Sequence, residues 1–213
     1  FYKEGRGKCM KKVLLVVVSL VLAAAMLATA TIPNPVTHEP EELTMEEVHQ
    51  RYLSYVTLET EGSVWGSSSK AVFLTPEYLI HNADYHAERN FFTEEERLKY
   101  REENLAMTKQ RWIIAVSLYS DNYPYRDYIN SKSSFTEITD ILLINDKGKK
   151  VKVEVKVIDE VKRLADGYYF CLNTFAFPKK TSDSEEIIDE NTKWIRVWII
   201  TPVERACFEY VFE

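Results

Sequence analysis

The sequence lacks an excess of basic charge and shows no extreme of composition. Its 27 Lys and Arg residues stand against 33 Asp and Glu residues, which gives a net charge of −6. A general nucleic-acid-binding protein needs a basic face that displaces counterions, so this class is excluded. Hydrophobic residues make up 46% and charged residues 28% of the 213 residues. These values are ordinary for one globular domain, and they exclude collagen, coiled coils and bulk disorder.

The sequence is also poor in residues that carry metal or thiol chemistry. It contains no H-E-x-x-H motif and no closely spaced cysteine pair, and none of its 4 histidines follows His86. His81, Asp84 and Glu88 share one face of a predicted helix, but a zinc site usually needs ligands from more than one element. We interpret these three residues as a solvated helix face and predict neither a metal nor a cofactor.

Serine motifs give an apparent match to another chemistry. Ser67–Lys70 fits S-x-x-K, Ser120–Asn122 spells S-D-N and Lys180–Ser182 approximates K-T-G, an order that resembles serine β-lactamases and penicillin-binding proteins. In those enzymes S-x-x-K opens a helix that places the lysine one turn from the serine. Here Lys70 leads into the apolar run Ala71–Leu74, so we reject the match and predict no catalytic residue.

One long apolar run lies near the N-terminus. The basic residues Lys11 and Lys12 precede Val13–Leu27, and Ala28–Ala30 has the A-x-A pattern of a cleavage site. We expect a signal peptide at 10–30, cut after Ala30, and therefore an exported protein, periplasmic or extracellular. The run is short for a membrane helix, so no membrane span is expected after cleavage.

The segments on either side of the predicted signal peptide are interpreted from their composition. A signal peptide begins at its methionine, so we interpret 1–9 as a translated leader that is not native. Three prolines in 31–43 predict an extended tether.

Helix-start signals dominate 44–109, which we predict to be a helical region. Thr44–Glu47 is a capping box and predicts a helix to about Glu59. Thr75-Pro76 predicts a helix to about Asn90. A second capping box at Thr93 predicts a charged helix to about Lys109.

From Arg111 the hydrophobic period changes to two. The clearest half-buried strand is Val151–Val157, where four valines alternate with charged residues. Further strands are expected at 112–119, 138–144, 168–175, 193–200 and 206–212. Because no helical pattern separates these strands, we predict an antiparallel immunoglobulin-like β-sandwich over 110–213. The expected fold class is α+β, with the N-terminal helices packed on the sandwich.

Two short motifs accompany this layout, Leu74–Glu77 (LTPE) at a helix start and Phe175–Pro178 (FAFP) in a strand. Together with the signal peptide and the acidic helices, they resemble uncharacterised exported proteins and lipoproteins of bacteria. The resemblance implies an envelope location and an immunoglobulin-like fold, and it implies no activity.

Aromatic residues supply the candidate binding site. If Ile195, Val197 and Ile199 face the core, the residues between them face outward together. Tryptophan and arginine can stack on sugar rings or anchor a partner protein. The candidate binding residues are Trp194, Arg196, Trp198, Tyr123 and Tyr125. The alternative is that the N-terminal helices cover this face and turn the tryptophans into a second core.

Cys171 and Cys207 are the cysteines that remain after the predicted cleavage. In an oxidising compartment they either form a disulfide or stay as two thiols, and the sequence leaves both open.

The resulting functional hypothesis is a non-catalytic binding or assembly module of the cell envelope. Its expected partner is an envelope protein or a polysaccharide. The alternative is a hydrolase of envelope polymer or peptide, for which Glu59, Glu61 and Asp84 are the candidate carboxylates.

Overall fold

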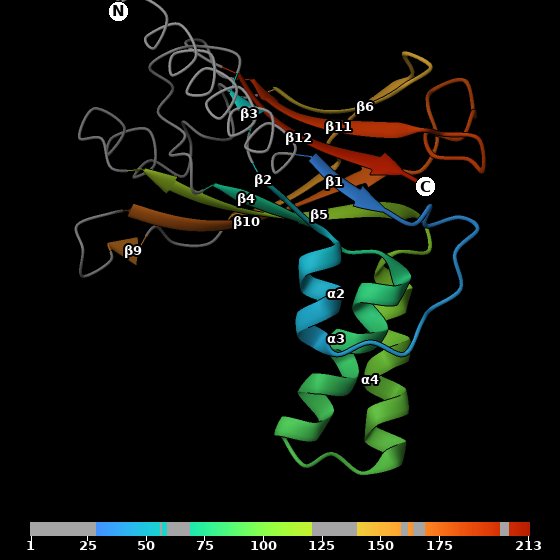
Figure 1. Ribbon diagram of the computed structural model, residues 1–213, viewed down its shortest axis with the longest axis vertical. Coiled ribbons are helices and arrows are strands. Elements are labelled where there is room, and N and C mark those ends of the chain that lie inside the picture. Colours follow the sequence, from blue (N-terminus) through green and yellow to red (C-terminus); the bar gives the residue numbers. More distant parts are fainter. Residues whose placement is uncertain are drawn as a thin grey trace, which may run out of the picture.

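The computed structural model describes residues 29–55, 57–58, 69–120, 140–158, 162–163, 169–200 and 205–213. These residues form an α+β fold, as the sequence predicts. Two sheets lie one above the other, and three helices project below the lower sheet (Figure 1).

The upper sheet, called sheet A, has the order β1-β12-β11-β6-β7, and β3 also pairs with β12. Its β1–β12 pair is parallel, and its other pairs are antiparallel. The bounds of its strands are β1 Thr29–Ile32, β3 Thr57–Leu58, β6 Asp140–Asn145, β7 Lys150–Lys152, β11 Trp194–Ile200 and β12 Arg205–Phe212.

The lower sheet, called sheet B, has the order β2-β4-β5-β10-β8, and β9 also pairs with β10. All of these pairs are antiparallel. The bounds of its strands are β2 Leu53–Tyr55, β4 Lys70–Phe73, β5 Arg111–Ser120, β8 Val155–Ile158, β9 Lys162–Arg163 and β10 Tyr169–Pro178.

One hydrophobic core holds side chains of both sheets. Phe73 of sheet B lies against Tyr210 of sheet A, with ring centroids 5.6 Å apart. The predicted inward stripe of β11 is confirmed, because Ile195, Val197 and Ile199 are fully buried. Burial of such large apolar surfaces is the main favourable term that holds the two sheets together.

The helices begin where the capping signals predict. Thr44, Thr75 and Thr93 are the N-caps of α2 (Met45–Arg51), α3 (Pro76–Arg89) and α4 (Glu94–Met107). The expected extension of the first helix to Glu59 is wrong, since α2 ends at Arg51. After the C-cap Tyr52, Leu53 and Ser54 are buried in β2 and pair with β4, so tertiary pairing overrides the local helical pattern.

The expected boundary, with helices at 44–109 and strands only from 110 onward, is wrong for the sheets. Strands β2, β3 and β4 come from the first of these segments and pair within the two sheets. The segment 31–43, expected to be an extended tether, begins inside sheet A, because Ile32 is part of β1 and is fully buried. The side-chain amide of Asn34 donates to the Asp189 carbonyl at 3.0 Å.

The expected continuous strand Val151–Val157 divides between the sheets. The Val153 amide donates to the Ile141 carbonyl of sheet A, whereas the next amide, that of Glu154, donates to the Ala176 carbonyl of sheet B. The chain therefore crosses from β7 to β8 at this point. Val151 is buried, but Val155 is 40% exposed, so the expected common buried face of the valines is wrong.

Candidate functional site

The outer face of sheet A carries the side chains that alternate with the core residues. In β11 these are Trp194, Arg196 and Trp198, and all three are half-buried. The register extends this face across the neighbouring strands. Its further members are Ile200, Arg205, Cys207, Glu209, Val211, Asp140, Leu142, Ile144, Lys150 and Lys152.

Arg196 is fixed at the centre of this outer face. Its Nε and Nη2 atoms both lie 2.8 Å from Oε1 of Glu209 on β12. Its guanidinium also lies over the Trp194 ring, 4.5 Å from the ring centroid. A charge-assisted contact and a cation–π contact thus hold one side chain in place, which leaves Arg196 little conformational freedom to lose on binding.

Apolar side chains continue the face beside Arg196. Trp198 pairs with Leu142 of β6, and Ile144 pairs with Arg196. Lysines border this apolar part, because Lys152 pairs with Leu142 and Lys150 with Ile144 on β7. Trp198, Leu142 and Ile144 therefore form an apolar area beside Arg196, and lysines border this area, as charged residues border the apolar part of many protein interfaces.

The charges of the outer face have the opposite sign to those of the whole chain. The face holds four basic side chains and two acidic ones, whereas the chain has a net charge of −6. The two acids are engaged, Glu209 with Arg196 and Asp140 with Lys152 at 2.8 Å. The face therefore carries a local basic excess.

The described helices do not lie over this face. Helices α2, α3 and α4 project below sheet B, on the far side of the molecule from β11 and β12 (Figure 1). The expectation that these helices cover Trp194 and Trp198 is therefore wrong. Tyr123 and Tyr125 lie outside the described residues, so their relation to the face stays a prediction.

The two cysteines lie in different sheets. Cys207 is on β12 of sheet A, on the face opposite to the core residue Phe208. Cys171 is on β10 of sheet B. A disulfide between them is one of the two alternatives that the sequence leaves open.

A cluster around Glu77 is the feature that sequence reasoning missed. Glu77 lies in the first turn of α3, and its side chain is 3% exposed. Four groups are within hydrogen-bonding distance of its carboxylate: the Glu41 amide at 3.0 Å, the Tyr52 hydroxyl at 2.5 Å, His38 at 3.3 Å and Arg51 at 3.4 Å. A Glu in a helix first turn is an ordinary sequence pattern, so no local signal distinguishes this one.

The environment of Glu77 sets its charge. Burial acts to raise the pKa of its carboxyl, but the hydrogen bonds from the Glu41 amide, Tyr52 and His38 outweigh burial and lower it. The same contact acts on Tyr52, where burial and the Glu77 carboxylate raise the pKa of the phenol. Glu77 is thus held as a carboxylate by donors that satisfy it.

Asp84, on the helix face read from the sequence as solvated, is also held as a carboxylate by its neighbours. It lies 3.0 Å from Nε of Arg97 and 2.5 Å from Nη2 of Arg101 on α4. Burial raises the pKa of its carboxyl, and the hydrogen bonds from both arginines lower it to below the usual range. His81 instead contacts the Glu41 carbonyl at 2.9 Å. Among the described residues no three His, Cys, Asp or Glu side chains converge on a possible metal position.

The other candidates for chemistry that lie among the described residues are found in separate places. Glu59 and Glu61 lie outside the described residues. Lys70 begins β4 rather than lying inside a helix, and Lys180 forms an ion pair with Glu186 at 3.2 Å.

The described helices are too short or too polar to cross a membrane.

No family model and no curated protein matches the chain. It is similar to a crystal structure of a novel protein of unknown function from Burkholderia pseudomallei K96243. The identity is 14%, the TM-score is 0.39, and the match covers 78% of this chain and 89% of that chain.

Proposed function

We propose that this chain is an exported, non-catalytic binding or assembly module of the bacterial envelope, and that the outer face of sheet A is its binding surface. The observation that carries the proposal is the fixed arrangement of Arg196 between Glu209 and the Trp194 ring. Export rests on the signal-peptide pattern of residues 10–30.

The composition of the outer face favours a protein partner over a polysaccharide. Sugar stacking uses an open aromatic ring face, and the guanidinium of Arg196 occupies one face of Trp194. The neighbours of Trp198 and Arg196 on β6 are the aliphatic residues Leu142 and Ile144. Aromatic and aliphatic residues with arginine are the anchors that protein interfaces use.

We also propose that the two sheets form an immunoglobulin-like sandwich. Two mainly antiparallel layers that share one core support this interpretation. The crossing from β7 to β8 supports it too, because sandwich strands can change sheets at such corners. In this arrangement the described helices lie on the side of sheet B, away from the outer face of sheet A.

The hydrolase alternative gains no support from its one described candidate. Asp84 is bound by two arginines, which keep it ionised and take up its oxygens. A general acid needs a raised pKa, and the pKa of Asp84 is lowered.

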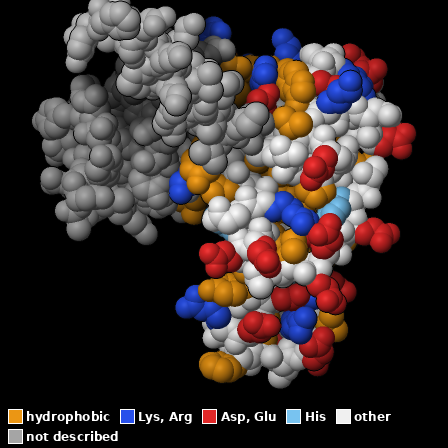
Figure 2. Space-filling model, in the orientation of Figure 1, with side chains coloured by type: hydrophobic (Ala, Val, Ile, Leu, Met, Phe, Trp, Pro, Cys, Tyr) orange, Lys and Arg blue, Asp and Glu red, His pale blue; other side chains and the backbone are white. Residues whose placement is uncertain are grey.

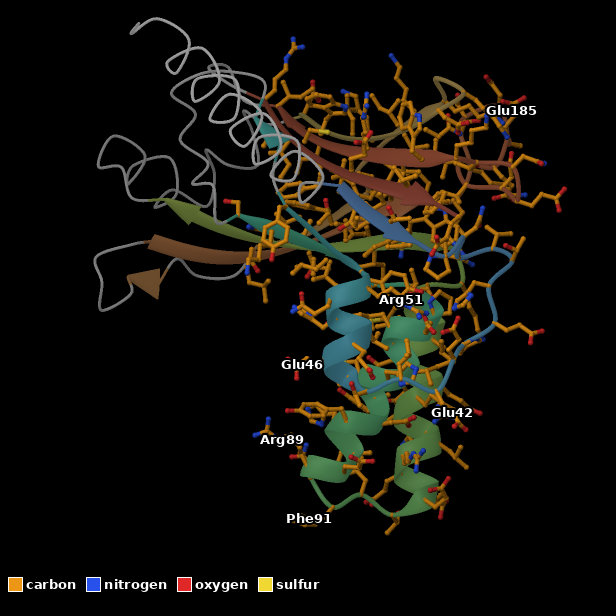
Figure 3. All side chains as sticks on the ribbon, in the orientation of Figure 1. Glu42, Glu46, Arg51, Arg89, Phe91 and Glu185 are labelled. Carbon is orange, nitrogen blue, oxygen red and sulfur yellow. The ribbon has the colours of Figure 1, made fainter. Side chains whose placement is uncertain are left out.

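A photocrosslinking side chain at Lys150 tests the binding surface in living cells. Lys150 is the first residue of β7 and is exposed at the border of the face, and Glu185 is an exposed control position in the loop between β10 and β11 (Figure 3). We expect an adduct of defined mass from position 150 and none from position 185. The adduct should disappear when Trp198→Ala is added. An adduct that survives Trp198→Ala, or no adduct from position 150, would overturn the proposal.

A further inference from the structure

Among the described residues, the most exposed large hydrophobic side chain lies at the end of the α3–α4 hairpin. Phe91 lies in the segment that connects α3 to α4, and it is 93% exposed. Figure 3 places it at the end of the projecting hairpin, far from both sheets. A fully exposed phenylalanine gains nothing from folding, because its ring stays in water.

The backbone at Phe91 adds to this cost. Its φ angle is +56°, in the left-handed region that favours glycine. The Phe91 amide donates to the Glu88 carbonyl, and the Phe92 amide donates to the Ala87 carbonyl, which is the Schellman pattern that ends a helix. This pattern usually has glycine where Phe91 stands, so the ring is not explained by stability.

The next residue has the opposite role. Phe92 packs on the rings of His86 and Tyr100, with centroids 6.2 and 5.8 Å away. These contacts fix the turn between the helices. Phe91 is therefore presented on a rigid support, as an anchor residue of an interface is.

The surroundings of Phe91 are acidic. Residues 88–96 contain four glutamates and one arginine, and acidic side chains gather over the helical lobe in Figure 2. This charge disfavours an anionic lipid surface as the target. It matches an apolar surface with a basic border.

The outer face of sheet A has those properties, with Trp198, Leu142 and Ile144 beside Lys150 and Lys152. The hairpin end and this face lie at opposite ends of the molecule, so one copy cannot join its own two surfaces (Figure 1). We propose that Phe91 of one copy docks on the outer face of sheet A of a second copy. The proposal rests on the proposed function and names its partner as this chain itself.

The contact joins two different surfaces, so it is heterologous. Each copy keeps one free hairpin and one free face after pairing, and copies can add in a row or close into a ring. The contact is centred on one aromatic anchor, so it is weak and depends on protein concentration. Because opposite charges border the two surfaces, salt weakens it.

Sedimentation velocity tests the docking of Phe91 on a second copy. The sample is the full chain, purified from the cells that produce it. We expect the sedimentation coefficient to rise with protein concentration and to fall back when salt is added. Phe91→Gly should abolish this rise and raise the melting temperature by about 2 °C, because it relieves the left-handed backbone. Met107→Ala, which removes another exposed side chain of the same hairpin, is the control and should leave association unchanged.

Mixing two defective variants tests the pairing of the surfaces. Phe91→Gly keeps the outer face, and Trp198→Ala keeps the hairpin end. Each should stay monomeric alone, and the mixture should form a heterodimer that does not grow further. Association of Phe91→Gly alone, or a mixture that stays monomeric, overturns the proposal.

The outcome separates this proposal from the binding function. A wild-type chain that remains monomeric at every concentration overturns self-docking. If position 150 still crosslinks to a different protein in cells, the binding function stands without it. An adduct of two copies of this chain, lost in Phe91→Gly, supports both.

Discussion

The hydroxyl of Tyr52 donates a 2.5 Å hydrogen bond to Oε2 of Glu77 and so joins the end of α2 to the first turn of α3. Both side chains are almost completely buried. A buried carboxylate is costly unless its oxygens are satisfied, and Glu77 is satisfied by groups from three segments. The contact therefore fixes the direction in which the helical hairpin leaves the sheets.

Removal of the Glu77 carboxylate should be strongly destabilising. Glu77→Ala leaves the Tyr52 hydroxyl and the Arg51 guanidinium without this acceptor, and breaking such a buried pair costs about 3–5 kcal/mol. Urea unfolding measures the loss. Tyr52→Phe removes one bond and should cost only about 1–2 kcal/mol. Equal stabilities of the wild type and Glu77→Ala would contradict the role given to this cluster.

Glu77 also predicts a pH dependence of stability. Its pKa is lowered in the folded state from the ordinary value of 4.5. Its contribution is therefore complete above that value and is lost as the pH falls through the folded-state pKa. Glu77→Gln should lose part of this acid sensitivity. Parallel stability curves of the two proteins between about pH 5 and 2 would contradict the prediction.

The Asp84 ion pairs should stabilise the hairpin specifically. Asp84→Asn leaves Arg97 and Arg101 without their shared acceptor, and we expect a loss of about 1–3 kcal/mol because Asp84 is only partly exposed. The exposed pair of Glu94 with Arg97 is a matched control, and Glu94→Gln should change stability by less than about 0.5 kcal/mol. Hydrogen exchange of α3 and α4 locates the effect. If Asp84→Asn exchanges the amides of α3 and α4 no faster than Glu94→Gln does, the stabilising role of the Asp84 ion pairs is contradicted.

The division of the expected Val151–Val157 strand predicts different effects of the same substitution at two valines. Val151→Asp places a carboxylate in the core and should cost several kcal/mol, about 3 or more. Val155→Asp concerns a side chain that is 40% exposed and should stay within about 1 kcal/mol. Thermal melting distinguishes the two. A similar shift for both valines would restore the single buried face that the sequence suggests.

Local signals in the sequence predict the helix starts and the inward stripe of β11. Thr44, Thr75 and Thr93 cap helices because a threonine side chain accepts from the backbone amides that helix starts leave open. Ile195 and its neighbours alternate because one face of the sheet is buried. These features depend on residues a few positions apart.

Features that depend on residues far apart in the chain cannot be predicted from local sequence patterns. The valine pattern cannot show that the amides of Val153 and Glu154 bond to different sheets. Likewise, the residues that bond Glu77 are 25 to 39 positions away in the sequence. The aromatic row of the candidate site is predictable by alternation, but its neighbours Leu142 and Lys152 come from strand pairing.

The cysteines should remain unlinked to each other. Cys207 lies on the face of sheet A that points away from the core, whereas Cys171 belongs to sheet B. A bridge would have to pass through sheet A, and disulfide geometry allows only about 4.4–6.8 Å between Cα atoms. Thiol labelling after non-reducing denaturation should modify both residues. Protein from the envelope that accepts no label would contradict this arrangement.

The predicted export makes a last measurement possible at β1. Cleavage after Ala30 removes Thr29 and Ala30 of this strand and leaves Thr31 and Ile32, of which Ile32 is fully buried. The carbonyl of Ile32 also accepts from the Glu213 amide at 3.1 Å, so the mature start is tied to the end of the chain. Intact mass of the exported protein should give a chain that begins at Thr31.

Ile32→Ala should cost about 2–5 kcal/mol in that mature protein, because it opens a cavity in the core. Thr31→Ala on the exposed side should cost less than about 0.5 kcal/mol. A full-length chain retained in the membrane fraction would contradict cleavage, and equal stability of the two variants would contradict the burial of β1 after cleavage.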